Sequence, residues 1–292
     1  MRHVAGLKNM SEEKKYGKVV LAAAGPGDPE LITAKAIRYL QQADVVLTDR
    51  LVSDDILKNY TNPDAEVVYV GKQCRRGFST PQQTINELIV EYAAQGKLVV
   101  RLKGGDVSIF SNILDELEVL AANKIPYEII PGVTAALGAA AYAGIPLTAR
   151  GHSTVVRFLT YYKSDIVTED YWKELANTSD TLVFYMSADT ADAVVGNLLR
   201  FGISNDKKIA VIEQATTPLQ NVHISEIYKY GERLGGMKFI SPSLIIIGKV
   251  VELHEQFAWL TNNQSSELYF KPGAFISKND DTEGKAGKIS RA

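Results

Sequence analysis

The segment GPGDPE, which runs from Gly25 to Glu30, connects a short apolar run to a helical pattern and indicates what kind of ligand it could face. A phosphate-binding loop would end in Gly-Lys-Ser or Gly-Lys-Thr, and a dinucleotide fingerprint would contain a third glycine. Here Gly27 is followed by Asp28, Pro29 and Glu30 instead. The two acids would repel a phosphate group, so the loop favours a ligand that has none. Taken alone, the same residues also fit a tight turn before a capped helix.

Four more unusual segments follow apolar runs later in the chain, namely DRLVS, VGK, KGGD and PGVTA. Ligands of open α/β sheets bind beyond the carboxyl ends of the strands, and all five segments are predicted at such ends. Gly104 and Gly105 allow the backbone to approach a ligand closely because they lack a Cβ. Asp106 offers an acceptor to a hydroxyl or an ammonium group. A nucleoside with a cationic tail, such as S-adenosylmethionine, fits this edge better than a nucleoside polyphosphate, although the residue types leave other cations open.

Short β-branched runs alternate with helical patterns through the first half of the chain. Helices are predicted between these runs. The second of them, at 81–96, has Pro81 in its first turn and Gly96 at its end. Strands that alternate with helices in this way indicate βαβ units and a parallel sheet. The predicted strands are 18–25, 44–50, 65–72, 97–105 and 126–132, and the predicted helices are 31–43, 81–96 and 113–124.

In the second half of the chain the predicted strands outnumber the helices, so we expect a mixed sheet. The helix at 135–143 consists mostly of alanine and glycine and must pack closely against a neighbour, which we expect to be the seam between two domains. The predicted strands are 155–162, 181–186, 208–216, 221–227 and 243–251, and the other helices are 191–202 and 228–234.

The fold class predicted from these patterns is α/β with two α/β domains. Residues 1–16 are expected to form a flexible extension, followed by an N-terminal domain at 17–132 and a C-terminal domain at 133–260. The tail at 261–292 is rich in Gly, Lys, Asp and Ser, which is typical of segments that cannot bury a core, so we expect it to be disordered.

Composition excludes several classes of function. The chain has 292 residues, of which 46% are apolar and 23% charged, as in soluble globular proteins. A net charge of -2 argues against a nucleic-acid partner. The single cysteine, Cys74, excludes an internal disulfide and a cysteine-based zinc cluster and favours the reducing cytoplasm. No apolar run reaches the roughly 18 residues of a membrane span, and the four histidines lack metal-ligand spacing, so neither a membrane nor a metal is expected.

The order of the motifs resembles that of uroporphyrinogen-III C-methyltransferases, within the tetrapyrrole methylase superfamily. The motifs run from about Gly17 to Leu260 and include VVLAAAGPGDPEL, GKLVVRLKGGD, PGVTAALGAAAYAGIPLT, TLVFYM and ISPSLIIIGKVV. The resemblance implies two α/β domains with the active site in the cleft between them, usually in a homodimer. It implies S-adenosylmethionine as cofactor, S-adenosylhomocysteine as product, and conversion of uroporphyrinogen III to precorrin-2 on the way to sirohaem or cobalamin.

The resemblance also implies roles for particular residues. Asp49 of TDRLVS would be the proton acceptor and Lys72 of VGK the proton donor. Composition alone favours ordinary structural roles for three of these residues. Asp49 would be a helix cap, Lys72 a surface lysine and Met186 a core methionine. Ala215 stands where the family has a glycine, so its contact would be through the backbone. The cofactor contacts would be Pro26, Gly104, Gly105, Asp106, Ile109, Thr134, Ala135, Met186 and Ala215.

The chain departs from the family pattern where the acceptor should bind. Val107 replaces a proline, Asn112 replaces an arginine expected to meet substrate carboxylates, and Ala149 replaces a histidine. Tyr161 and Tyr162 replace Gly-His. Because uroporphyrinogen carries eight carboxylates, other cations would have to bind them. The candidates are Arg50, Arg75, Arg76, Lys103 and Arg150.

Two alternatives remain open at the level of sequence. The cleft could accept another tetrapyrrole or a different acceptor of the same superfamily. The chain could also be a non-catalytic protein that binds S-adenosylmethionine or a tetrapyrrole. An enzyme should lose turnover when Asp49 and Lys72 are substituted, whereas a binding protein should keep its affinity.

Overall fold

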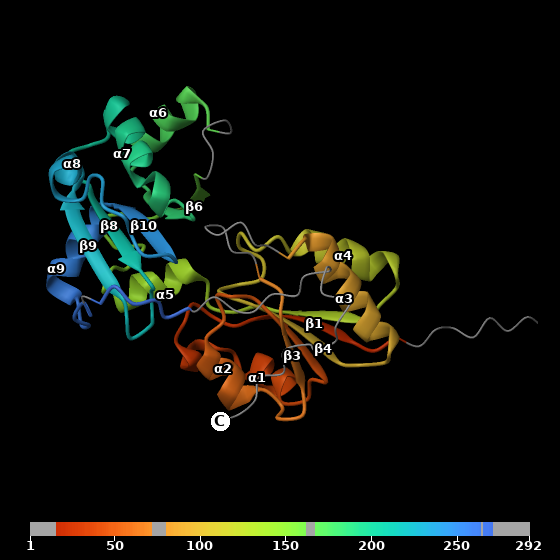
Figure 1. The fold of residues 1–292 in the computed structure, drawn as a ribbon. Helices are drawn as coiled ribbons and strands as arrows, with labels where there is room; N and C mark the ends of the chain where they lie inside the picture. The colour runs from red at the N-terminus through yellow and green to blue at the C-terminus, as the bar shows by residue number, and fades with distance from the viewer. Residues whose placement is uncertain (1–15, 72–79, 162–166, 264, 271–292) are drawn as a thin grey trace, which may run out of the picture.

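The computed structural model describes residues 16–71, 80–161, 167–263 and 265–270, which fold into two α/β domains side by side (Figure 1). The fold class predicted from the sequence is confirmed. No helix among these described residues is both long enough and apolar enough to cross a bilayer.

The N-terminal domain is built on a sheet of five parallel strands. In spatial order the strands are β3 (Glu66–Tyr69), β2 (Val45–Thr48), β4 (Val99–Lys103), β1 (Val19–Ala23) and β5 (Tyr127–Ile130). Every residue of β1, β2 and β4 is buried, as expected for parallel strands that are covered on both faces. The carboxyl ends of β1 and β4 meet because Ala23 pairs with Lys103.

Helices cover both faces of this sheet (Figure 1). On one face, Ile32, Ala36 and Ile56 pack against alternate residues of the strands. On the other face, Ile85, Ile89 and Leu120 pack against the intervening ones. The helices are η1 (Pro29–Leu31), α1 (Ala34–Leu40) and α2 (Asp54–Tyr60) on the first face, and α3 (Gln82–Ala94) and α4 (Ile113–Ala122) on the second.

The C-terminal domain has a mixed five-stranded sheet, as expected. Only the pair β6–β7 is parallel, and the other neighbours are antiparallel. In spatial order the strands are β6 (Val156–Thr160), β7 (Thr181–Tyr185), β10 (Ser243–Gly248), β8 (Lys208–Glu213) and β9 (Asn221–Glu226). The helices are α5 (Ala135–Tyr142), α6 (Glu169–Asn177), η2 (Ala188–Thr190), α7 (Ala191–Arg200), η3 (Ile227–Lys229), α8 (Tyr230–Arg233), η4 (Lys249–Leu253) and α9 (His254–Phe257).

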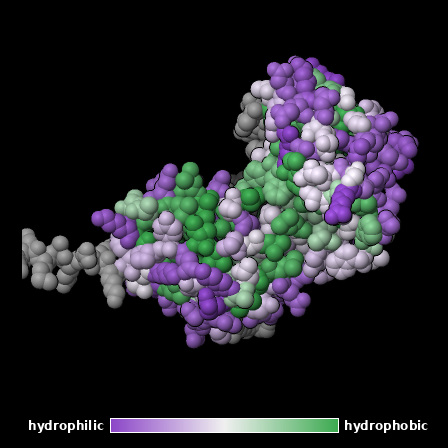
Figure 2. All heavy atoms as spheres, turned by 180° about the vertical axis from the view of Figure 1, so that it is seen from behind, coloured by the Kyte–Doolittle hydropathy of each residue, from purple (hydrophilic) through white to green (hydrophobic). Residues whose placement is uncertain are grey.

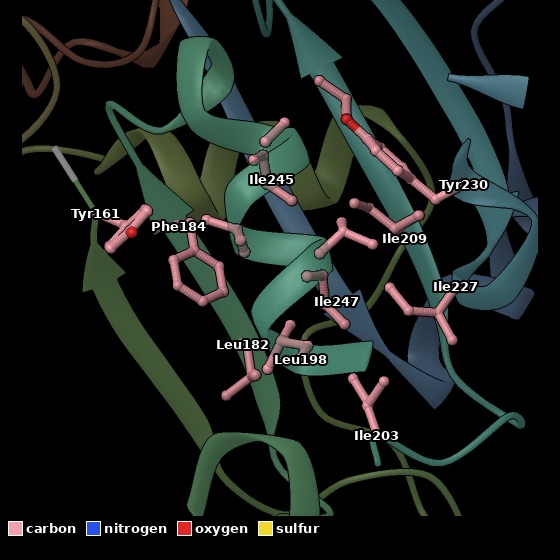
Figure 3. Packing of buried hydrophobic residues seen from close by; sticks show 14 of the residues in the cluster. Tyr161, Leu182, Phe184, Leu198, Ile203, Ile209, Ile227, Tyr230, Ile245 and Ile247 are labelled. Atoms are coloured by element: carbon pink, nitrogen blue, oxygen red, sulfur yellow. The ribbon is translucent and has the colours of Figure 1, made fainter. Parts of the chain in front are cut away.

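One face of this mixed sheet carries the larger apolar core (Figure 3). Phe184 of β7, Ile245 of β10 and Ile209 of β8 pack there against Leu198 of α7 and Tyr230 of α8. The small residues of α5 cover the other face together with η4. Buried apolar clusters thus separate along the chain between Ile130 in the first domain and Ala136 in the second.

The small-residue helix α5 lies at the seam between the domains, where the sequence predicts a close contact. A Cβ placed on Gly138 would lie 2.6 Å from Cγ of Pro26 and 2.9 Å from Cγ2 of Thr216. Pro26 belongs to the loop after β1, and Thr216 to the loop between β8 and β9. Gly138 is therefore required by the approach of two loops, one from each domain.

The segment after α9 differs from the expectation of a disordered tail within its described residues, 261–263 and 265–270. The side chain of Asn262 exchanges hydrogen bonds with the backbone of Val222, at 2.8 and 2.9 Å. Further along, Tyr269 is hydrogen-bonded to Ser53 of the N-terminal domain at 2.9 Å, and Phe270 is buried. These bonds attach the segment to both domains. Residues 271–292 lie outside the described residues, as do residues 1–15 of the extension predicted at 1–16.

Polar and apolar side chains are unevenly distributed on the side of the molecule opposite to Figure 1 (Figure 2). Hydrophilic side chains cover most of the C-terminal domain there, whereas hydrophobic ones gather on the N-terminal domain and toward the seam. Large exposed apolar residues of the N-terminal domain include Tyr127 and Ile129 on the edge strand β5.

Candidate active site

Two glycine loops meet at the carboxyl edge of the first sheet. The amide of Gly25 donates to the carbonyl of Gly105 at 3.1 Å, and the amide of Gly105 donates to the carbonyl of Gly25 at 2.7 Å. Gly105 has a φ of 71°, which favours glycine, and a Cβ built there would meet only the amide of Ala135, at 3.8 Å. The backbone of the GGD turn therefore presents an open face beside the start of α5.

Asp106 connects the GGD turn to the next loop rather than standing free. Its Oδ2 accepts the amide of Gly132 at 2.8 Å, and its Oδ1 accepts the amide and the hydroxyl of Ser108 at 2.8 and 2.5 Å. Burial works to raise the pKa of Asp106, but the hydrogen bonds from Ser108 and Gly132 outweigh it and lower the pKa. The carboxylate thus stays charged and fixes the PGVTA loop against the GGD turn.

The second domain contributes Tyr185 and Met186 at the end of β7. The hydroxyl of Tyr185 is hydrogen-bonded to that of Thr134 at 2.8 Å and accepts the amide of Ala136 at 3.1 Å. Its ring lies 4.9 Å from that of Phe110, in the loop after the GGD turn. Met186 has a φ of 54° and is 56% exposed, so it is not the core methionine that composition alone would favour.

Ala215 lies where the loop between β8 and β9 touches the GPGDPE loop. A Cβ on Gly27 would lie 2.8 Å from Cγ2 of Thr217 and 3.0 Å from the carbonyl oxygen of Ala215. Since Pro26 also packs on α5, three of the motifs converge at this point, two of them from the second domain.

Asp28, one of the two acids of the first loop, joins the two domains. Oδ2 of Asp28 accepts the hydroxyl of Tyr142 at 2.5 Å, and Oδ1 caps η1 by accepting the amide of Glu30 at 2.8 Å. The amide of Asp28 donates to Oγ1 of Thr216 at 3.0 Å. The amide and both carboxylate oxygens of Asp28 are therefore hydrogen-bonded to other groups of the protein. These bonds explain why the glycine loop contains this acid without a role in ligand binding.

Among the described residues, five of the six non-glycine residues with a left-handed backbone lie in these same loops, and the sixth, Lys124, follows α4. Phe110 and Asn112 lie between β4 and α4, Met186 follows β7, and Gln214 and Thr216 lie between β8 and β9. Their φ values run from 47° to 65°. Such conformations are costly for residues other than glycine and are typical of functional sites, since only a well-packed surrounding maintains them.

The acid predicted to accept a proton, Asp49, is the partly exposed end of a buried charge network. Nη2 of Arg101 donates to Oδ1 of Asp49 at 2.6 Å. Nε of Arg101 donates to Glu116 at 2.9 Å, and the ammonium of Lys103 donates to the other oxygen of Glu116 at 3.0 Å. Side-chain exposure is 26% for Asp49 but 5% or less for the other three. Sequence analysis identified neither Arg101 nor Glu116. The available signal was an arginine within the apolar strand VVRLK, where a charge needs a partner.

Burial and neighbouring charges act on the two cations in different ways. For Arg101, burial alone would lower the pKa, but the carboxylates of Asp49 and Glu116 outweigh it and raise the pKa. For Lys103, burial and the adjacent Arg101 together lower the pKa in spite of Glu116. Lys103 had been predicted to bind substrate carboxylates. Its ammonium is buried and paired with Glu116, so this prediction is not supported.

The other predicted cations fall into three groups. Arg50 is half-buried beside Asp49, in the loop that packs against Gly71 and Gly104. Arg150 is exposed, and its neighbour Ala149 packs against the same apolar cluster of the second domain that Ile109 and Ala135 contact. The predicted donor and the remaining two cations, Lys72, Arg75 and Arg76, lie outside the described residues.

The remaining predicted contacts lie along the same loops. Ile109 is partly buried against the apolar cluster of the second domain, so the loop after β4 reaches across the seam. Ala135 is the first residue of α5, next to Thr134. Within the described ranges, no three His, Cys, Asp or Glu side chains are grouped closely enough to hold a metal ion.

Comparison with known proteins identifies the family. A model described as Tetrapyrrole (Corrin/Porphyrin) Methylases matches residues 18–230. Siroheme synthase of Saccharophagus degradans is 46% identical over 246 residues, which are 84% of this chain and 53% of that protein. Siroheme synthase of Azotobacter vinelandii is 44% identical over 254 residues, 87% of this chain and 54% of that protein. The chain therefore spans about half the length of the curated relatives it matches.

Solved structures extend the comparison to the fold. Uroporphyrin-III-C-methyltransferase from Thermus thermophilus superposes with a TM-score of 0.69 and 32% identity, covering 84% of this chain and 98% of that one. A structure of this enzyme complexed with S-adenyl homocysteine has a TM-score of 0.67 and 33% identity, with coverage of 81% and 94%. Cobalt precorrin-4 methyltransferase has a TM-score of 0.70 and 28% identity, with coverage of 80% and 95%. With most of its length matched by the family model and by these structures, the chain belongs to the tetrapyrrole methylase family.

Proposed function

We propose that this chain is an S-adenosylmethionine-dependent C-methyltransferase that converts uroporphyrinogen III to precorrin-2. The observation that carries the proposal is the convergence of loops from both domains at one sheet edge, with Asp49 partly exposed at that edge. Relatives named siroheme synthase and a similar structure named uroporphyrin-III-C-methyltransferase support the assignment.

The loops fit S-adenosylmethionine on chemical grounds. Gly105 leaves an open backbone face, and the small residue Ala135 borders it. The loop after β1 carries no lysine that could bind a phosphate, which suits a ligand without phosphates. Met186 presents an exposed apolar side chain from the second domain, suited to an adenine ring. A similar enzyme has been solved with S-adenyl homocysteine, which differs from this cofactor by one methyl group.

The reaction needs orientation and proton transfer from the protein. Bound S-adenosylmethionine supplies an electrophilic methyl group on a sulfonium. An electron-rich pyrrole carbon forms a bond to this methyl as the carbon–sulfur bond breaks. The electron pair of the broken bond stays on sulfur. The methylated macrocycle then carries a positive charge and must lose a proton. Asp49 is the described group suited to accept it, and holding the two reactants in line supplies much of the acceleration.

Arg50 is the cation among the described residues that we assign to a substrate carboxylate. It follows Asp49 directly, and its guanidinium can bind a carboxylate through two parallel hydrogen bonds. Lys72, the proton donor implied by the resemblance, stays part of the proposal although it lies outside the described residues.

The proposal is tested by anaerobic incubation of the purified chain with uroporphyrinogen III and S-adenosylmethionine. We expect a product heavier by two methyl increments and two equivalents of S-adenosylhomocysteine. The variant Asp49→Asn should bind the cofactor with unchanged affinity, measured by calorimetry, and its kcat should fall about 100-fold or more to a residual turnover that can still be measured. Cofactor binding by the wild-type chain without methyl transfer would contradict this acceptor.

A second candidate is methylation of another tetrapyrrole. It is favoured by Asn112, which is exposed and has a left-handed backbone conformation. Uroporphyrinogen-III C-methyltransferases, which the sequence resembles, have an arginine at this position. Mass spectrometry of parallel incubations with later corrinoid precursors separates the two candidates, since only one acceptor should gain methyl groups. Retention of cofactor affinity without turnover on any acceptor would instead favour a binding protein.

We also propose that the chain acts as a homodimer in the cytoplasm, without a nucleic-acid or membrane partner. The family resemblance supports the dimer, and the single cysteine and net charge of -2 support the rest. Light scattering after size-exclusion chromatography should give twice the mass of 32.0 kDa. A monomer at micromolar concentration would contradict the dimer.

A further inference from the structure

The guanidinium of Arg101 is held rigidly on all sides. Nη1 donates to the carbonyls of Leu47 and Leu102, each at 3.2 Å, and Nε donates to Glu116 at 2.9 Å. These contacts come from β2 and β4 of the sheet and from α4, which packs on that sheet. Nη2 is directed to Asp49 at 2.6 Å. Asp49 is the partner of Arg101 that reaches solvent, and it is therefore bound by a guanidinium whose orientation is fixed by its other contacts.

The charges of the network balance. Arg101 and Lys103 supply two positive charges, and Asp49 and Glu116 supply two negative ones. Burying a guanidinium in a strand is costly and adds little net stability even when it is paired. A buried arginine in the central strand β4 is therefore more readily explained by what it does for its exposed partner than by stability.

The orientation of Asp49 follows from this contact. Arg101 occupies Oδ1, and within the described part of the chain no hydrogen bond to Oδ2 is present. The loop of Asp49 is fixed as well, since its amide donates to Leu102 at 3.2 Å and a Cβ on Gly104 would lie 2.7 Å from the carbonyl of Leu51. One oxygen of Asp49 is thus anchored to the sheet, while the other accepts no hydrogen bond from the described residues.

We propose that Arg101, anchored by Glu116, is a positioning residue that orients Asp49 for proton transfer. Arg101 does not touch the substrate and acts through Asp49. The inference rests on the proposed function for its kinetic consequence, but the orientation itself is a structural claim that can be tested separately.

The variant Arg101→Lys keeps the charge and loses the planar fork that reaches Asp49 and Glu116 together. We expect kcat to fall about 10- to 100-fold, while the KM values for both substrates change less than about threefold. In the Asp49→Asn background, Arg101→Lys should change kcat less than about twofold, because the group through which Arg101 acts is gone. A purely structural role would give the same fall in both backgrounds and would overturn the proposal.

Arg157 offers a matched control. It also lies in a strand and bridges two carboxylates, Glu174 and Asp180, but it belongs to β6 in the other domain and is 29% exposed. Arg157→Lys should leave kcat within about twofold of wild type. If Arg101→Lys does not fold, Glu116→Gln replaces it in the same comparison with and without Asp49→Asn. This variant removes the carboxylate that anchors Arg101 and keeps the guanidinium of Arg101.

Crystal structures of wild type and variant provide a test without turnover. In Arg101→Lys the carboxylate of Asp49 should leave its wild-type position, and in Arg157→Lys it should stay. An unmoved carboxylate in Arg101→Lys overturns the proposal even if kcat falls. If the wild-type chain does not methylate uroporphyrinogen III, the proposed function fails, and the crystal structures still decide whether Arg101 orients Asp49.

Discussion

Tyr142, in the second domain, donates its hydroxyl to Oδ2 of Asp28, in the first, at 2.5 Å. The bond joins the end of helix α5 to the loop after β1. Because Pro26 and Thr216 meet Gly138 on the same helix, α5 acts as the surface on which both loops are seated. The geometry of the proposed cofactor site therefore depends on this seam.

Replacing Tyr142 with Phe should lower the free energy of unfolding by about 1–2 kcal/mol, since a bond to a carboxylate is lost. Burial and the neighbouring Asp28 raise the pKa of Tyr142 to about 12, above its ordinary value of 10.0. A raised pKa in the folded state gives stability that is complete below the unfolded pKa and is lost as pH rises through the folded one. Between about pH 10 and 12, wild type should therefore lose stability more steeply than Tyr142→Phe.

Urea unfolding at several pH values measures this difference. Tyr228→Phe is the control, because the hydroxyl of Tyr228 donates to Ile203 within one domain. Parallel curves for wild type and Tyr142→Phe above pH 10 would contradict the raised pKa.

Gly138→Ala should destabilise the chain by about 1–3 kcal/mol, because the new methyl group would overlap Pro26 and Thr216. It should also weaken binding of S-adenosylmethionine, measured by calorimetry, since both displaced loops carry proposed contacts. Gly196→Ala in α7 is the control, because a Cβ there has no atom within 4 Å. That variant should be stabilised by up to about 1 kcal/mol through its higher helix propensity. Equal effects at the two positions would count against a seam built on Gly138.

Arg50→Ala should raise the KM for uroporphyrinogen III about tenfold and change kcat less than about threefold, because a carboxylate contact serves binding rather than chemistry. The difference from wild type should shrink at high ionic strength, since salt screens the attraction. Arg200→Ala, which removes an arginine that is 62% exposed on α7, should leave the KM unchanged. An unaltered KM in Arg50→Ala would remove Arg50 from the proposed substrate site.

Phe270→Ala should lower the free energy of unfolding by about 3–4 kcal/mol, because its side chain is buried although it lies in a polar tail. Phe257→Ala is the matched control, since that side chain is 52% exposed and should cost less than about 1 kcal/mol. Thermal unfolding of both variants measures the difference. An unchanged free energy of unfolding in Phe270→Ala would instead support the expectation that the tail does not contribute to the stability of the fold.

Two of the helices that escaped prediction from the sequence, α2 and α6, did so for physical reasons. The helix α2 has seven residues and buries only Ile56, which is too little for a helical period to stand out. The helix α6 buries Trp172 and Leu175 on a nine-residue segment with a negative mean hydropathy. Both begin at a capping side chain, Ser53 and Thr168, and this was the signal that could have revealed them.

Predictions about charged side chains depended on facts that no local pattern contains. Lys103 and Arg101 lie two residues apart in one strand, yet both are buried and share Glu116, which is contributed by a helix. Asp28 was expected to face a ligand and instead accepts a hydroxyl 114 residues away. The hydrogen-bond partner of a carboxylate is one of the groups that folding brings near it, and such groups can be far from the carboxylate in sequence.

By itself, the sequence determined the alternation of strands and helices, the parallel and mixed sheets and the family of the chain. These features follow from apolar periodicity and from motifs that are local, so they can be read along the chain. Tertiary structure alone decided which polar groups are paired, which loops meet at the seam and which end of β7 faces them. Such relationships arise from the burial of residues that are distant in sequence, where the cost of leaving a polar group without a partner selects one arrangement.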